Sequence, residues 1–186
     1  MGPEGRAEDK HDPRGKVRLK LAGDVTGGAV FSDCGRYRPM LTRDLAGGEG
    51  MILWIGMNPS TAAADVDDPT VRRETDFSRQ WGFGRFVKCN VMDYRATHPK
   101  DLVAPGVAPC SPANLPLIRE QAAGAGRIML AFGALAPKLQ VHGQAVVEAL
   151  RADGHDLWCL GLTKAGAPRH PLYMRKDSTP IRFDGT

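Results

Sequence analysis

Residues 51–70 read MILWIGMNPSTAAADVDDPT, and the predicted fold is organised around this stretch. It opens with an apolar run bounded by glycines, a pattern typical of a β-strand that is buried on both faces. Gly56 allows backbone angles that a side chain would forbid, and Pro59 biases Asn58 towards an extended conformation. A polar side chain is thus held at the C-terminal end of a buried strand, where open α/β sheets place their ligands. We therefore predict that Asn58 lies at the centre of an active site.

Outward from this strand, the chain alternates between strand and helix patterns. Further strands are expected at residues 85–92, 127–132 and 156–161, and helices at residues 70–81, 111–125 and 134–151. This alternation predicts an α/β fold, a three-layer α/β/α sandwich with a central, mainly parallel sheet. Residues 25–186 are expected to form one domain. Residues 1–24 are charged and rich in Gly and Pro, and are expected to be a disordered tail.

Cap and turn residues set the expected element boundaries. Asp68 and Ser111 are the predicted N-caps of the first two helices, because each is followed by a proline suited to the first helical position. The first helix is expected to stop at Gly82. A hairpin over residues 29–41 is expected to cover the sheet edge, and residues 99–103 are expected to form a turn or short helix.

Composition favours a soluble cytoplasmic protein. Of the 186 residues, 42% are hydrophobic, and the net charge of +4 is only weak support for nucleic-acid binding. The four cysteines form no CxxC pair, so zinc and iron–sulfur sites are not expected. We expect free thiols in a reducing compartment. No signal peptide is indicated, and the longest apolar stretch, residues 128–136, is too short to span a bilayer. We expect a monomer without a cofactor or a membrane partner.

Polar side chains follow three of the predicted strands. These are Asn58, then the segment from Asn90 to Arg95, then the segment from Thr163 to His170. Since the C-terminal ends of parallel strands share one edge, these groups could converge. Asn58 and Asn90 each offer a donor and an acceptor, which suits a nucleobase, and His170 could donate or carry a proton. Five basic residues could contact phosphate: Arg72, Arg73, Arg95, Lys164 and Arg169.

In this order of motifs, residues 50–173 resemble the uracil-DNA glycosylase superfamily. The matching motifs are Gly56-Met57-Asn58-Pro59, Asn90, Cys110-Ser111-Pro112, the FGALA of residues 132–136 and His170-Pro171. More closely, the chain resembles a family of mainly bacterial and phage proteins without a settled function. That family's hallmarks resemble MNPSTA, DDPT-x-RR, RAT-x-P and TK-x-G-x-PRHPLY as they stand here.

The superfamily resemblance implies a uracil-DNA glycosylase-like fold that hydrolyses an N-glycosidic bond in a nucleic acid or nucleotide. Asn58 would position a water, Asn90 would bond the base edge, and His170 would stabilise negative charge on the leaving base. Phe77, Trp81 or Phe83 would stack on the base. The loop around Asn58 would contact the substrate through Gly56, Met57, Pro59, Ser60 and Thr61.

Departures from the superfamily pattern leave two alternatives open. Ser60 replaces the usual Gly or Tyr, and the late motif is HPLY rather than HPSP. Three carboxylates, Asp65, Asp67 and Asp68, follow Asn58 and would repel phosphate. Asp68 could act as a general base, or the three could bind a hydrated metal or contact a ribose. The alternatives to an N-glycosidase are thus a non-catalytic nucleobase-binding module and a metal-assisted hydrolase.

Overall fold

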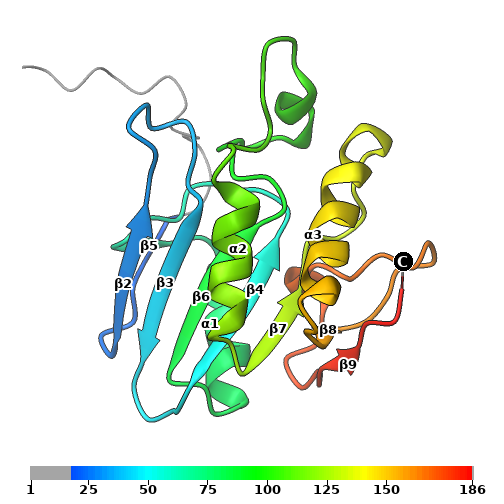
Figure 1. The fold of residues 1–186 in the computed structure, drawn as a ribbon. Coiled ribbons are helices and arrows are strands. Elements are labelled where there is room, and N and C mark those ends of the chain that lie inside the picture. Colours follow the sequence, from blue (N-terminus) through cyan, green and yellow to red (C-terminus); the bar gives the residue numbers. More distant parts are fainter. Residues whose placement is uncertain (1–17, 186) are drawn as a thin grey trace, which may run out of the picture.

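The computed structural model describes residues 18–185 of the chain as a layered α/β structure (Figure 1). Residues 1–17, most of the predicted tail, lie outside the described residues. Two residues that the prediction placed in the tail form a short strand, β1 (Leu19–Lys20), which pairs antiparallel with β5 (Val66–Asp67). The chain is therefore joined to the body of the protein from Leu19 onwards.

The main sheet has seven strands in the order β2-β3-β6-β4-β7-β8-β9. Their bounds are β2 Val25–Val30, β3 Met40–Leu45, β4 Met51–Gly56, β6 Arg85–Asn90, β7 Arg127–Leu130, β8 Leu157–Cys159 and β9 Ile181–Arg182. Four adjacent strands, β6, β4, β7 and β8, run parallel, as predicted. The sheet as a whole is mixed, because β2, β3 and β9 join through antiparallel pairings. The expected hairpin is present at one edge as β2 and β3, although its strands extend beyond residues 29–41.

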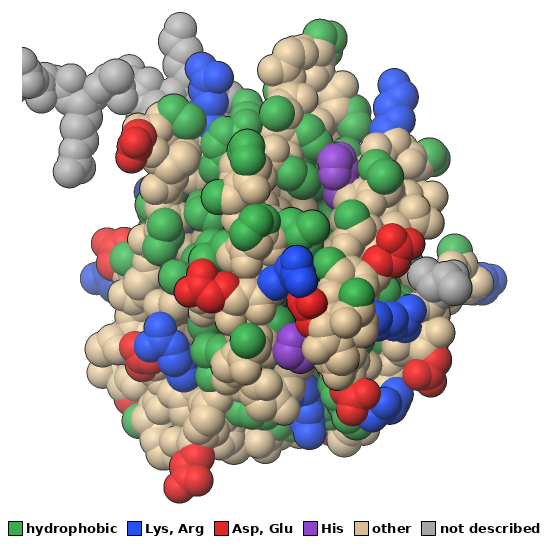
Figure 2. All heavy atoms as spheres, viewed as in Figure 1, with side chains coloured by type: hydrophobic (Ala, Val, Ile, Leu, Met, Phe, Trp, Pro, Cys, Tyr) green, Lys and Arg blue, Asp and Glu red, His purple; other side chains and the backbone are tan. Residues whose placement is uncertain are grey.

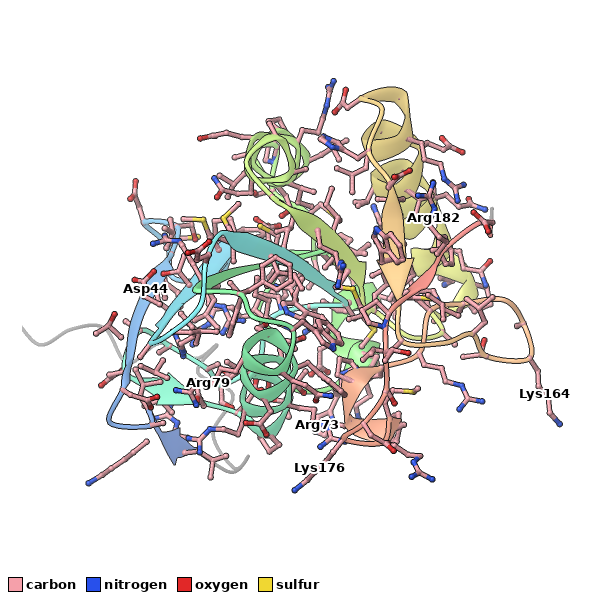
Figure 3. All side chains as sticks on the ribbon, turned by 90° about the horizontal axis from the view of Figure 1, so that it is seen from below. Asp44, Arg73, Arg79, Lys164, Lys176 and Arg182 are labelled. Carbon is pink, nitrogen blue, oxygen red and sulfur yellow. The ribbon has the colours of Figure 1, made fainter. Side chains whose placement is uncertain are left out.

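Three α-helices cover the two faces of the sheet, and Figure 3, viewed from below, shows the resulting three layers. One face packs against α1 (Pro69–Gln80), and the other against α2 (Asn114–Ala123) and α3 (Gln140–Ala152). Short 3₁₀ helices occur at η1 (Pro99–Val103), η2 (Pro137–Leu139) and η3 (Pro171–Tyr173). Each face therefore has its own hydrophobic core, with the sheet between them.

Local hydrogen bonds explain where the helices begin. Asp68 caps α1 as predicted, since its Oδ1 accepts the Val71 N–H at 2.9 Å. Gly82 follows the helix with a φ of 79°, which a glycine adopts without strain. The predicted cap at Ser111 is wrong, because α2 begins at Asn114. The Ser111 N–H and Oγ–H instead donate to the carboxylate of Asp93 at 2.7 and 2.5 Å. The side chain of Ser111 is thus bonded to a residue outside the helix rather than to the first turn of α2.

Aromatic packing places Trp54 in the core next to α1. Its indole N–H donates to Ser78 Oγ at 3.0 Å. The rings of Trp81 and Phe77 lie 5.7 and 6.3 Å from that of Trp54. Phe77 and Trp81, which were candidates for base stacking, are therefore part of this core. All four cysteines are free thiols, in agreement with the sequence analysis.

Candidate functional site

A cavity of about 530 Å³ lies on the α1 side of the sheet, where β4 and β6 end. Its volume is within the range of roughly 300–1,000 Å³ usual for small-molecule sites. The predicted residues that line it are Gly56, Met57, Asn58, Ser60, Asp68, Asn90 and His170. Residues from four separate segments of the chain thus meet at one place, including all three proposed to be catalytic.

Strand register brings the floor of the cavity together. Gly56 of β4 lies opposite Asn90 of β6, and Trp54 lies opposite Lys88. Lys88 and Asn90 are two residues apart, so they share the face of β6 that is turned towards α1. A Cβ atom on Gly56 would lie 2.7 Å from Asn90 Oδ1 and 3.0 Å from Lys88 Nζ. The glycine is therefore required here for space.

The amide of Asn58 is fixed by the backbone around it. Its Nδ2 donates to the carbonyl oxygens of Pro59 at 3.0 Å and Ala96 at 2.8 Å. These two bonds use both amide hydrogens, which leaves Oδ1 as the group that can meet a ligand. Asn58 therefore presents a hydrogen-bond acceptor to the cavity.

The amide of Asn90 is in the opposite situation. Asn90 is fully buried, and within residues 18–185 neither its Oδ1 nor its Nδ2 has a hydrogen-bond partner. We call this group the open amide of Asn90. Its backbone is held in place, since Asn114 Nδ2 donates to the carbonyl oxygens of Asn90 and Val91 at 3.0 Å each. Buried polar atoms are rarely left unpaired, so the open amide indicates a ligand or water position.

Two cations, Lys88 and Arg38, also line the cavity and were not predicted. Lys88 forms an ion pair with Glu74, which reaches across from α1 and is fully buried. Burial raises the pKa of Glu74, and the charge of Lys88 opposes that rise. Arg38 is buried and donates to the Ala62 carbonyl; burial lowers its pKa to about 10, against the effect of Asp68. The alternation that places Lys88 on the face of Asn90 is the signal that could have identified it.

His170 and Asp68 border the cavity from two different elements. His170 precedes η3, which packs against α1. Its Nδ1 accepts the Leu172 N–H at 3.4 Å, so the proton of the neutral ring belongs on Nε2. Asp68 is largely buried and brings a carboxylate to the N-terminus of α1 while it caps that helix. The cavity therefore holds an imidazole donor and a carboxylate as well as two amides.

The remaining predicted substrate-binding residues lie outside the cavity lining. Pro59 and Thr61 are buried in the loop after β4. Arg72 is paired with Asp67 at 3.1 Å and donates to the Lys20 carbonyl, and Arg73 donates to the Met174 carbonyl.

Three more predicted phosphate contacts also lie outside that lining. Arg95 donates to the Gly35 carbonyl at 2.9 Å, and Arg169 to the Leu162 carbonyl at 3.0 Å. Lys164 is exposed and extends away from α1 (Figure 3).

The three aspartates after Asn58 do not share a site. Asp65 is exposed, Asp67 is buried between Arg43 and Arg72 at 2.9 and 3.1 Å, and Asp68 caps α1. In the described part of the chain, no group of three His, Cys, Asp or Glu side chains could hold a metal ion. The interpretation of these aspartates as a metal cluster is therefore wrong, because tertiary partners separate them.

Comparisons with known proteins give one match. No curated protein and no solved structure matches the chain. No helix within residues 18–185 is long and apolar enough to cross a membrane. Residues 36–172, which include every residue that lines the cavity, match the family described as "Protein of unknown function (DUF1643)". Because this match covers well over half of the sequence, the chain belongs to the DUF1643 family.

Proposed function

We propose that the protein is an N-glycosidase, a hydrolase that cleaves the bond between a nucleobase and its sugar. One observation carries the proposal: the open amide of Asn90 and the acceptor Oδ1 of Asn58 border the same cavity. An open amide can pair with a base edge that offers one donor and one acceptor. The acceptor of Asn58 can orient a water towards the anomeric carbon. Recognition of the base and orientation of the water are two of the tasks that hydrolysis of a nucleoside requires.

The other cavity residues suit the remaining parts of the reaction. The transition state of glycosidic cleavage is oxocarbenium-like, and the negative charge of Asp68 in the cavity would stabilise it. The Nε2–H of His170 can donate to an oxygen of the leaving base. Ser60 Oγ and Thr97 Oγ1 line the cavity and have no hydrogen-bond partner within residues 18–185, so they are available to sugar hydroxyls.

The likeness to the uracil-DNA glycosylase superfamily supports the same proposal. Asn58, Asn90 and His170 occur in the superfamily's order along the chain, and the described fold has helices on both faces of a sheet with a parallel centre. We therefore extend the proposal to a uracil-DNA glycosylase-like fold.

The surface beside the cavity favours a base within a nucleic acid as the substrate. Residues 169–176, which include the cavity residues His170 and Leu172, contain no acidic residue, and Arg169 and Lys176 are exposed there. Tyr173 is 82% exposed, and its ring lies 5.8 Å from that of His170. The opposite face, which α2 and α3 cover, carries intermingled acidic and basic side chains (Figure 2). A basic segment with an exposed aromatic ring at the cavity is typical of single-strand binding.

Replacing Tyr173 with Ala is expected to weaken binding of a uracil-containing single-stranded oligonucleotide by roughly 5- to 150-fold, since one base–aromatic stack contributes about 1–3 kcal/mol. Fluorescence anisotropy of a labelled oligonucleotide measures the change. Tyr173→Phe keeps the ring and should bind as the wild type does. Equal affinity for Tyr173→Ala and the wild type would show that the neighbouring base does not stack there.

Base release is the experiment that tests the proposed function. The protein is incubated with single- and double-stranded oligonucleotides and free nucleotides that carry uracil, hypoxanthine and modified bases, and freed base is detected by mass spectrometry. Release by the wild type and not by Asn58→Ala supports the proposal. If a folded wild-type protein releases no base from any substrate, the proposal is wrong.

A nucleobase-binding module without catalysis is the second candidate. The observation that favours it is that the cavity carboxylate has a structural role, since Asp68 Oδ1 accepts the Val71 N–H. Such a module would bind the same bases and leave them intact, which the base-release experiment and calorimetry together distinguish.

A further inference from the structure

Lys88 lies next to the open amide of Asn90 in the wall of the cavity. Asn90 Oδ1 and Lys88 Nζ lie 2.7 and 3.0 Å from the position that a Cβ atom on Gly56 would take, so the two polar atoms are near neighbours over this glycine. Both side chains line the cavity, although Lys88 is only 5% exposed. A ligand in the cavity that reaches the amide of Asn90 would therefore also meet Lys88.

The ion pair of Lys88 fixes the position of its ammonium but does not use all of its N–H donors. An ammonium has three N–H donors, and the ion pair with Glu74 Oε1 uses one. Glu74 itself does not line the cavity. A buried ion pair adds little stability over apolar side chains of the same size, so stability alone is a weak reason to place a lysine there. The ion pair with Glu74 therefore holds Lys88 in the cavity wall and leaves N–H donors of its ammonium for a ligand.

The two groups at the floor differ in what they can discriminate. The open amide of Asn90 can turn by 180°, so it accepts a base edge with either a carbonyl or an amino group. Lys88 can only donate. A carbonyl oxygen facing Lys88 gains a charge-assisted hydrogen bond, whereas an amino group there would place two donors against each other.

We propose that Lys88 is a further catalytic and specificity-determining residue, which selects bases with a carbonyl oxygen at this edge and stabilises their negative charge as they leave. The inference rests on the proposed function and names its substrate class, the oxo-bases. In the reaction, the C1′–N bond breaks with its electron pair on the base. The water oxygen bonds to C1′, and the proton lost by this water neutralises the departed base.

The test uses a variant that removes the charge of Lys88 and keeps most of the length of its unbranched side chain. In Lys88→Met the carboxyl of Glu74 is left alone, so a second variant, Lys88→Met with Glu74→Gln, removes both charges together. Lys138→Met, at an exposed position of the 3₁₀ helix η2, is the matched control. Circular dichroism establishes that each variant is folded.

Substrates are compared in pairs that differ at one group: uracil with cytosine, and hypoxanthine with adenine, each in the same single-stranded oligonucleotide. In the wild type, kcat/KM for the oxo-base should exceed that for the amino-base. Both Lys88 variants should lose about 10²- to 10³-fold in kcat for uracil, the usual effect of removing one donor to a developing anion. The loss should be smaller for 5-fluorouracil, which leaves more readily and needs less stabilisation. The control should match the wild type.

Other results would decide against the inference or against the proposed function. An equal loss for uracil and 5-fluorouracil, with the ratio of oxo- to amino-base unchanged, would overturn the inference and leave the ion pair structural. If the wild type releases no base, the proposed function fails, and calorimetry with free uracil, cytosine, hypoxanthine and adenine decides the selectivity of Lys88 separately. If the wild type binds oxo-bases more tightly than amino-bases and Lys88→Met does not, the role of Lys88 in selectivity stands. If the wild type shows no such preference, or binds no base, that role is overturned.

Discussion

Asn58→Ala is expected to lower base release by about 10²- to 10³-fold without unfolding the protein, since it removes the only acceptor that Asn58 offers to the cavity. The Asn58 Nδ2 bonds to Pro59 and Ala96 hold the loop, so a modest loss of thermal stability should accompany the loss of activity. Single-turnover kinetics with a uracil-containing oligonucleotide measures the chemical step directly.

A matched variant separates the catalytic role of Asn58 from its role in the loop. Asn58→Asp keeps an acceptor oxygen but loses the two donors, so it should perturb the loop more than the water site. If Asn58→Ala retains full activity, Asn58 does not position the water and the mechanism must be rebuilt around Asp68 or His170.

Asp67→Ala is expected to destabilise the protein by about 3–5 kcal/mol, because it leaves the fully buried guanidinium of Arg43 without its carboxylate. Asp67 also forms an ion pair with Arg72, and Arg72 donates a hydrogen bond to the Lys20 carbonyl in β1. The variant should therefore weaken the attachment of β1 as well. Urea denaturation followed by circular dichroism gives the change in the free energy of unfolding.

The neighbouring aspartate provides the control. Asp65 is exposed, and Asp65→Ala should change the free energy of unfolding by no more than about 0.5 kcal/mol. Similar small effects for both variants would mean that the ion pairs of Asp67 add nothing to stability.

The sequence predicted those parts of the fold that depend on local pattern. The apolar run that became β4, the Asp68 cap and the parallel centre of the sheet all follow from spacing and residue type. Asn58 and Asn90 could be brought together in advance because parallel strands end at one edge. His170 followed from the family resemblance rather than from its surroundings, since a histidine in a loop carries no local signal of its own.

The parts that were missed depend on contacts between layers. Lys88 and Glu74 meet only because α1 packs over β6, and neither shows this partner in its own segment. Three of the arginines predicted to contact phosphate, Arg72, Arg73 and Arg95, donate to backbone carbonyls that are distant in sequence. Ser111 has a good cap sequence, but Asp93 competes for its donors across 18 residues.

The division of the protein by its sheet has a consequence for how it can be altered. The cavity borders α1, whereas most of the core beneath α2 and α3 lies on the other face of the sheet; Ala96 belongs to that core and also lines the cavity. Substitutions that lie far apart and share no partners tend to act independently. Ile118, Val146 and Leu150 belong to that core and do not line the cavity, so substitutions among them can change thermal stability with little effect on the residues of the site. Thermal stability and the chemistry of the site can therefore be altered largely independently in this fold.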